Sequence, residues 1–197
     1  MILRIDHVSL AVEDYEKAVE FFTKILGAVP QTAAEDSKLK YYWEIFALGD
    51  LSRLEIVKPT GDGSFLDNFI KKRKNGIHHV TLQTKDIKKM KEFLEKNKIP
   101  FFGYNDYGDS WKELFIHPKD AFGVLIQIGE FEADDWLSEP NKMPNGMKWS
   151  FSEKDGRYNL KFAHPGGGKM TLDLDRDGIT NLISDLEKLT QNYSIEE

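Results

Sequence analysis

Two histidines in this chain, His7 and His79, have matched surroundings. His7 lies in the stretch IDHVSLAVEDYEKAVEFF, and His79 lies in IHHVTLQTKDIKKMKEFL. Two further polar residues share the match, because Glu55 follows His7 at the same separation along the chain as Gln127 follows His79. Two imidazole nitrogens with a carboxylate and an amide oxygen form a ligand set that suits a divalent transition metal. The spacing therefore predicts one metal site built from all four side chains.

The neighbours of Glu55 and Gln127 indicate that these two side chains face a cavity. Each lies in an aliphatic stretch, LEI for Glu55 and IQI for Gln127, that is typical of a buried strand. Side chains alternate between the two faces of a strand, so a polar residue in such a stretch is either buried in the core or turned toward a cavity. We therefore expect both side chains to point into a cavity that they share with the histidines.

The two histidine-containing stretches also indicate an internal duplication. When they are aligned so that His7 meets His79, nine positions between Ile5 and Lys24 have identical counterparts between Ile77 and Lys96. Composition alone would give about one or two matches over so short a window. A long unit that occurs twice favours two halves of one domain over a solenoid, which repeats a shorter unit many times.

Each half reads as a strand, a helix and three further strands, and a short helix near 65–74 connects the halves. In the first half, Asp14 is expected to cap the helix and Gly27 to end it. The expected strands of this half are 4–12, 28–34, 40–48 and 52–58. The expected elements of the second half are a strand at 77–84, a helix at 86–97 and strands near 101–105, 112–117 and 122–129. The predicted fold class is α+β, with paired β-α-β-β-β modules at about 3–58 and 76–129 that form one metal-binding cavity.

The last third of the chain reads as a separate extension. It begins with a polar, acidic segment interrupted by Pro and Gly, which is typical of a linker or a covering loop. The elements expected after it are strands at 147–152, 157–163 and 169–174 and an amphipathic helix at about 178–191. We therefore predict a domain at 1–130 and a strand-rich C-terminal extension, ββ(β)α in order, at 131–197.

Composition excludes several function classes. The 197 residues carry a net charge of −6, which counts against a nucleic-acid partner. No apolar run reaches the ~18 residues that a membrane-spanning helix requires, and the first residues enter a strand without a signal-peptide pattern. The chain contains no cysteine, so neither disulfides nor thiolate chemistry contribute. We expect a cytoplasmic protein without a membrane or nucleic-acid partner.

The motifs of residues 3–129 resemble the vicinal oxygen chelate superfamily, which includes glyoxalases, bleomycin resistance proteins and dioxygenases. The stretches that carry the resemblance are IDHVSLAVEDYEKAVEFF, LEIVKPTG, NGIHHVTLQTKDIKKMKEFLEKNKIP and FIHPKDAFGVLIQI, and their combination is most similar to the methylmalonyl-CoA epimerases. The resemblance implies a fold of paired β-α-β-β-β modules with metal ligands at the positions of His7, Glu55, His79 and Gln127. It also implies one divalent ion (Co, Ni, Zn, Mn or Fe), a small-molecule substrate such as an acyl-CoA, and a homodimer.

The activity that the resemblance implies is isomerisation by proton transfer α to a metal-bound carbonyl. The epimerases carry a catalytic glutamate at the position of Gln127. Because a pseudo-twofold axis should relate the two halves, we expect Glu55 to supply this carboxylate from the other side of the metal. Glu44, at a strand position where some epimerases carry a glutamate, is the expected second catalytic residue.

Three alternatives stand beside this interpretation. A glyoxalase-like lyase of the same superfamily would use the same ligands. A dioxygenase would use two histidines and one carboxylate on iron, a set that His7, His79 and Glu55 provide. A non-catalytic ligand-binding module would explain the replacement of glutamate by Gln127 as a loss of catalysis. Metal content separates the last alternative from the enzymes.

Overall fold

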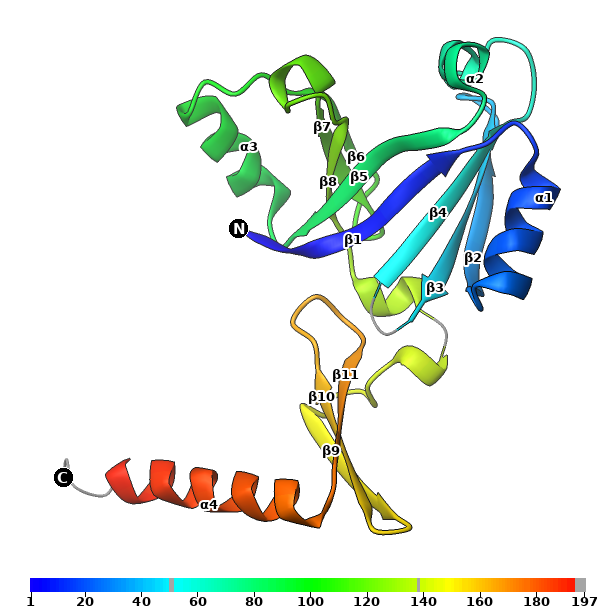
Figure 1. The fold of residues 1–197 in the computed structure, drawn as a ribbon. Helices are drawn as coiled ribbons and strands as arrows, with labels where there is room; N and C mark the ends of the chain where they lie inside the picture. Colours follow the sequence, from blue (N-terminus) through cyan, green and yellow to red (C-terminus); the bar gives the residue numbers. More distant parts are fainter. Residues whose placement is uncertain (50–51, 138, 194–197) are drawn as a thin grey trace. The chain divides into compact units, whose positions relative to one another are not determined.

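The computed structural model describes residues 1–49, 52–137 and 139–193. Contacts divide the chain into two units, Met1–Pro140 and Asn141–Glu197 (Figure 1). The division lies ten residues beyond the boundary expected from the sequence, so the segment 131–140 belongs with the first unit.

The first module has the predicted order of elements. Asp14 begins its helix, because the Asp14 carboxylate accepts a hydrogen bond from the Lys17 N–H at 3.0 Å. One face of this helix packs on a core that includes Phe46 and Ile56. The elements are β1 (Ile2–Ala11), α1 (Tyr15–Glu20) with a π-helical continuation (Phe21–Ile25), β2 (Val29–Asp36), β3 (Tyr41–Leu48) and β4 (Ser52–Pro59).

The second module repeats this order after the connecting helix α2 (Asp67–Arg73). Asp86, the repeat equivalent of Asp14, caps its helix in the same way, since it accepts from the Lys89 N–H at 2.9 Å. The last strand begins four residues later than predicted, because Phe122 and Gly123 have φ values of 54° and 92° and form a turn before it. The elements are β5 (Gly76–Thr84), α3 (Ile87–Lys96), β6 (Phe102–Asp106), β7 (Lys112–Ile116) and β8 (Ile126–Glu130).

All eight strands form one curled sheet in the order β2-β3-β4-β1-β5-β8-β7-β6 (Figure 1). The modules meet where β1 pairs antiparallel with β5, and each of these strands runs parallel to the last strand of its own module. Val8 pairs with Val80, its own repeat equivalent, so the pseudo-twofold axis passes between these two residues. The predicted fold class of paired β-α-β-β-β modules is confirmed.

The second unit is a small antiparallel sheet followed by a helix, as expected. Within this unit the strand order is β11-β10-β9. Its elements are β9 (Trp149–Lys154), β10 (Arg157–Ala163), β11 (Lys169–Leu174) and α4 (Arg176–Tyr193). Short 3-10 turns occur earlier in the chain at Pro118–Asp120, Ala133–Trp136 and Glu139–Asn141. None of the helices in the described part of the chain is both long and apolar enough to cross a membrane.

A chain of residues 1–140 should fold without the second unit. The end of this segment contributes Trp136, whose ring contacts Trp43 and Trp111 and whose carbonyl oxygen accepts a hydrogen bond from Arg53. A chain that ends at residue 132 loses these contacts, and its free energy of unfolding should be lower by about 2 kcal/mol. Urea unfolding followed by circular dichroism measures the difference. Aggregation of the chain of residues 1–140 would contradict its independence.

Candidate metal centre

Two central strands bring the predicted histidines together. In the antiparallel pairing of β1 with β5, His7 lies opposite Thr81 and His79 lies opposite Ser9. The two imidazole rings are therefore diagonal neighbours, with centroids 5.7 Å apart. β4 runs parallel to β1 and pairs Glu55 with Ser9. One ligand atom from each of His7, Glu55 and His79 lies within 4.8 Å of the other two.

The distances within this cluster fit a divalent ion. Glu55 Oε2 lies 3.9 Å from His7 Nε2 and 3.5 Å from His79 Nε2. Two ligands that each lie about 2.1 Å from a tetrahedral ion are separated by roughly 3.4 Å. Glu55 Oε2 is also buried, and it accepts no hydrogen bond from any residue that the structure describes. A cation would satisfy this buried oxygen and the two imidazole nitrogens together.

Burial shifts the pKa values of two of these residues. Removal from water raises the pKa of Glu55, and the nearby imidazole of His7 opposes this shift. Burial lowers the pKa of His79, and the neighbouring imidazoles of His7 and His78 lower it further. His79 is therefore neutral at pH 7, which is the form in which an imidazole nitrogen binds a metal.

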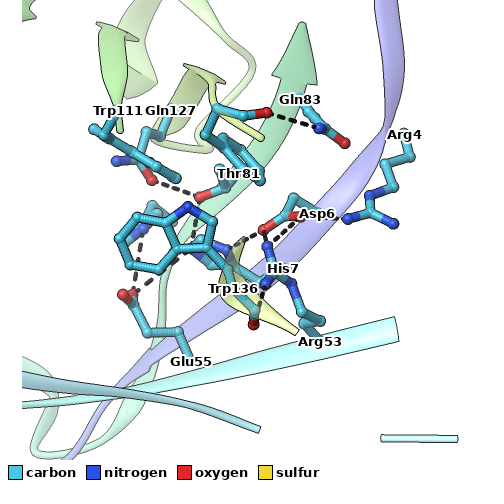
Figure 2. Close-up of polar contacts among 12 residues, drawn as sticks. Arg4, Asp6, His7, Arg53, Glu55, Thr81, Gln83, Trp111, Gln127 and Trp136 are labelled. Atoms are coloured by element: carbon cyan, nitrogen blue, oxygen red, sulfur yellow. Dashed lines mark hydrogen bonds and ion pairs between the residues drawn. The ribbon is translucent and has the colours of Figure 1, made fainter. Parts of the chain in front are cut away.

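Asp6 orients His7. Asp6 Oδ2 lies 2.8 Å from His7 Nδ1, and this nitrogen must donate its hydrogen to the carboxylate, so Nε2 remains on the side of Glu55. The carboxylate of Asp6 also pairs with the guanidinium groups of Arg4 and Arg53 (Figure 2). Burial alone would raise the pKa of Asp6, but the hydrogen bond from His7 and the two arginine charges hold it well below its usual value.

Gln127 lies at the repeat-equivalent position of Glu55. The pairing of Thr81 with Gln127 repeats that of Ser9 with Glu55. The Thr81 hydroxyl donates to Gln127 Oε1 at 2.6 Å and also lies 2.8 Å from His7 Nε2 (Figure 2). Gln127 Nε2 donates to the carboxylate of Glu113 at 2.6 Å. Since only the NH₂ group of an amide can donate, this bond directs the amide oxygen toward Thr81 and the histidines.

Glu44 does not join the cluster. It pairs with Ile56 in the sheet, whereas its neighbour Ile45 pairs with Glu55, so Glu44 points to the face that α1 covers. There the Tyr15 hydroxyl donates a hydrogen bond to Glu44. The expectation that Glu44 is the second catalytic residue is therefore not supported by the geometry.

A different carboxylate, Glu113, faces the cavity instead. Phe115 of β7 pairs with Gln127, as Ile45 of β3 pairs with Glu55, so Phe115 and Ile45 are equivalent positions of the two modules. Glu113 and Trp43 each lie two residues before these positions and are therefore equivalent as well. Besides the bond to Gln127, it accepts hydrogen bonds from Trp111 Nε1 at 2.8 Å and Asn105 Nδ2 at 2.9 Å. Sequence comparison of the halves missed it, because a tryptophan occupies the equivalent position. The one indication in the sequence was that Glu113 and Phe115, two residues apart in the strand KELFI, must lie on the same face.

The cluster borders a cavity of about 180 Å³. This is smaller than the ~300–1,000 Å³ typical of sites for drug-sized ligands, so it suits a small polar group. Polar side chains that line it include His7, Arg53, Glu55, Glu113 and Gln127. Aromatic side chains that line it are Tyr41, Trp43, Tyr107, Trp111 and Trp136.

Known proteins share this fold and its motifs. Residues 6–115 match the family model described as "Glyoxalase/Bleomycin resistance protein/Dioxygenase superfamily". The mitochondrial methylmalonyl-CoA epimerase of Homo sapiens is 33% identical over 128 residues, which cover 64% of this chain and 72% of that protein. The ethylmalonyl-CoA/methylmalonyl-CoA epimerase of Cereibacter sphaeroides is 32% identical over 132 residues, which cover 65% of this chain and 98% of that protein. The crystal structure of methylmalonyl-CoA epimerase from Mycobacterium tuberculosis matches with a TM-score of 0.61 and 26% identity, over 66% of this chain and 88% of that chain.

Replacement of His7 or His79 by Ala should remove the metal from the purified protein, because each variant keeps only part of the three-residue cluster. Mass spectrometry of metal content, after loading with one divalent ion and dialysis, gives the number of ions per chain. Glu44→Gln is the matched control, since this carboxylate lies on the opposite face, and it should bind as much metal as the wild type. Full occupancy in the His7→Ala/His79→Ala double variant would exclude this site.

Asp6→Asn should weaken metal binding about 10–100-fold, because an amide orients His7 less firmly than a carboxylate does. The same change leaves the charges of Arg4 and Arg53 without their buried partner and should lower the free energy of unfolding by about 3–5 kcal/mol. Competition with a chromophoric chelator measures the first effect, and urea unfolding measures the second. An unchanged metal affinity would show that Asp6 does not position the ligand.

Proposed function

Because the chain belongs to the glyoxalase/bleomycin resistance protein/dioxygenase superfamily, we propose that it is a metal-dependent isomerase that transfers a proton at the carbon α to the carbonyl of an acyl-CoA. One observation carries the proposal. The cluster of His7, Glu55 and His79 borders a cavity that also receives Glu113, so carboxylates from both modules face one small space. The acyl-CoA substrate class follows from the names of the human and Cereibacter sphaeroides relatives.

The proposed metal ligands are His7, Glu55 and His79, with the amide oxygen of Gln127 as the fourth. A divalent ion (Co, Ni, Zn, Mn or Fe), when bound, would stabilise the negative charge that develops on a carbonyl oxygen during proton removal. The buried oxygen of Glu55 that accepts no hydrogen bond from the described residues supports this assignment. Asp6 holds His7 in the orientation that the ligand role requires.

Epimerisation requires removal of a proton from one face of the α-carbon and delivery of a proton to the other face. We assign these two steps to Glu55 and Glu113. The two residues lie on strands of opposite modules, and both line the cavity. Glu113 takes the role that the sequence suggested for Glu44.

Two buried donors suggest how the substrate is oriented. Arg53 Nε and Trp136 Nε1 are buried and donate to no acceptor among the described residues, and both side chains line the cavity. Such donors are costly unless a ligand accepts their hydrogen bonds. A carboxylate on the acyl group would accept from both, which agrees with an acyl chain of the malonyl type.

A lyase or dioxygenase of the same superfamily is the second candidate. It is favoured by the hydrogen bonds of Gln127, whose amide oxygen accepts from Thr81 and whose nitrogen donates to Glu113. If Gln127 stays in these bonds, the ligands are two imidazoles and one carboxylate, the set that iron dioxygenases use. The homodimer and the cytoplasmic location expected from the sequence remain predictions.

Wild-type protein loaded with metal should exchange the α-proton of methylmalonyl-CoA for solvent deuterium, which mass spectrometry detects. Glu55→Gln and Glu113→Gln should each slow the exchange by about 10²-fold or more, because an amide cannot accept a proton. Glu113→Gln should keep the bound metal, and Glu44→Gln is the control that should keep both metal and exchange.

Two results would contradict this assignment in different ways. The absence of α-exchange with every short-chain acyl-CoA tested would exclude the isomerase and favour the lyase, the dioxygenase or a binding module. Normal exchange in Glu113→Gln would keep the isomerase and exclude Glu113 as one of its two proton-transfer groups.

A further inference from the structure

A second and larger cavity lies beside the metal cluster and shares no lining residue with the first. It is a groove of about 670 Å³. One wall is formed by α2 and the start of β5, and the other by the connection between β7 and β8. Its polar lining consists of Asn68, Lys72, Arg73, His78 and His117. The remaining lining is mostly apolar, with Phe65, Phe69, Ile77, Val124 and Leu125 among it. We call it the α2 groove.

The α2 groove carries positive charge without acidic compensation. Among the described residues, no aspartate or glutamate lines it, and neither Lys72 nor Arg73 forms an ion pair. The guanidinium of Arg73 lies over the ring of Phe69, 5.5 Å from its centroid. The negative end of the α2 dipole favours cations at this position, but it gives no reason for them to line a concave surface with two imidazoles. An anionic ligand supplies that reason.

The two imidazoles of the groove are hydrogen-bond donors. His117 Nδ1 accepts from the Lys119 N–H at 3.2 Å, so in the neutral ring Nε2 carries the hydrogen. His78 Nδ1 lies 2.9 Å from His79 Nδ1. If His79 Nε2 binds the metal, its Nδ1–H donates to His78, and the hydrogen of His78 is then on Nε2. The wall of the groove therefore offers N–H groups as well as charges to an anion.

The apolar part of the groove favours a flat aromatic group next to that anion. Phe65, Ile77 and Val124 are 44%, 57% and 40% exposed, so a large part of this wall is open to a ligand. The rings of Phe65 and Phe69 also hold His78 between them, with centroid distances of 5.5 and 5.2 Å. A nucleotide combines a base that packs on aromatic and aliphatic side chains with phosphates that accept from Lys, Arg and His.

The groove and the metal cluster share a wall, because the His78 and His79 rings are in contact. The cavity beside the metal has about 180 Å³ and the groove about 670 Å³. The small cavity suits an acyl group, and the larger groove is within the ~300–1,000 Å³ range of sites for larger organic ligands. A ligand with a small acyl end and a large nucleotide end matches the two spaces.

We propose that the α2 groove binds the phosphate-bearing nucleotide end of the acyl-CoA, with Lys72, Arg73 and His117 as phosphate ligands. The proposal rests on the proposed function for the identity of the whole ligand. The binding of the nucleotide itself depends only on the groove and is testable separately.

Adenosine 3′,5′-bisphosphate is the probe, because it has the nucleotide of coenzyme A without the thioester or the acyl group. Isothermal titration calorimetry on the full-length chain should detect its binding, and the Nε2–H or ring signals of His117 should shift in NMR spectra. Lys72→Glu/Arg73→Glu should weaken binding at least about tenfold. Lys72→Gln/Arg73→Gln, a milder change for the end of α2, should weaken it in the same direction. Lys88→Glu/Lys96→Glu on α3 has the same change in net charge and should bind as the wild type does.

Several outcomes would overturn the proposal. The absence of bisphosphate binding to the wild type would exclude the groove as a nucleotide site. Equal weakening in the α3 control would show a general charge effect. Inorganic phosphate that binds as tightly as the bisphosphate would show a site for free phosphate. The probe has no acyl group, so its binding does not depend on the isomerase. If the wild type binds the bisphosphate but shows no α-exchange, only the proposed isomerase activity is contradicted. If it shows α-exchange but does not bind the bisphosphate, only the proposed role of the groove is contradicted.

Discussion

The antiparallel pairing of β1 with β5 is the contact on which both the fold and the metal cluster depend. Val8 and Val80, equivalent positions of the repeat, face each other at its centre. This register sets His7 and His79 on one face. The parallel pairing of β4 with β1 adds Glu55, and that of β8 with β5 adds Gln127. A slip of β5 by one residue against β1 would place His79 on the face opposite His7. The register that joins the modules therefore also assembles the candidate ligands.

The cluster places polar groups where the sheet would otherwise bury apolar ones. Asp6 is 1% exposed and is stabilised there by two arginines and the hydrogen bond from His7. Glu55 has no comparable compensation, since one of its oxygens accepts no hydrogen bond from the described residues. The modules offset these costs with separate apolar cores under α1 and α3. A polar site without full compensation inside a well-packed sheet is typical of a functional site.

The internal repeat made the fold and most of the polar cluster predictable from the sequence. Residues at a constant offset in equivalent strands must meet around the axis, so the sequence predicted that His7, Glu55, His79 and Gln127 come together. Their role as metal ligands remains a prediction. Glu44 was misplaced because its face depends on the register between β3 and β4, and Ile45 pairs with Glu55 instead. Glu113 has no acidic counterpart in the first module, so the repeat did not point to it. The α2 groove was missed because its walls come from two separate segments, 65–78 and 117–125, whose contact exists only in the folded chain.

An anomalous difference map, recorded at the absorption edge of the metal in crystals of the loaded protein, would show whether the cluster binds metal. We predict one peak per chain, about 2.0–2.2 Å from His7 Nε2, His79 Nε2 and a Glu55 carboxylate oxygen. The peak should disappear in His79→Ala crystals. A map without a peak between these three side chains, or with its only peak elsewhere on the chain, would exclude this metal site.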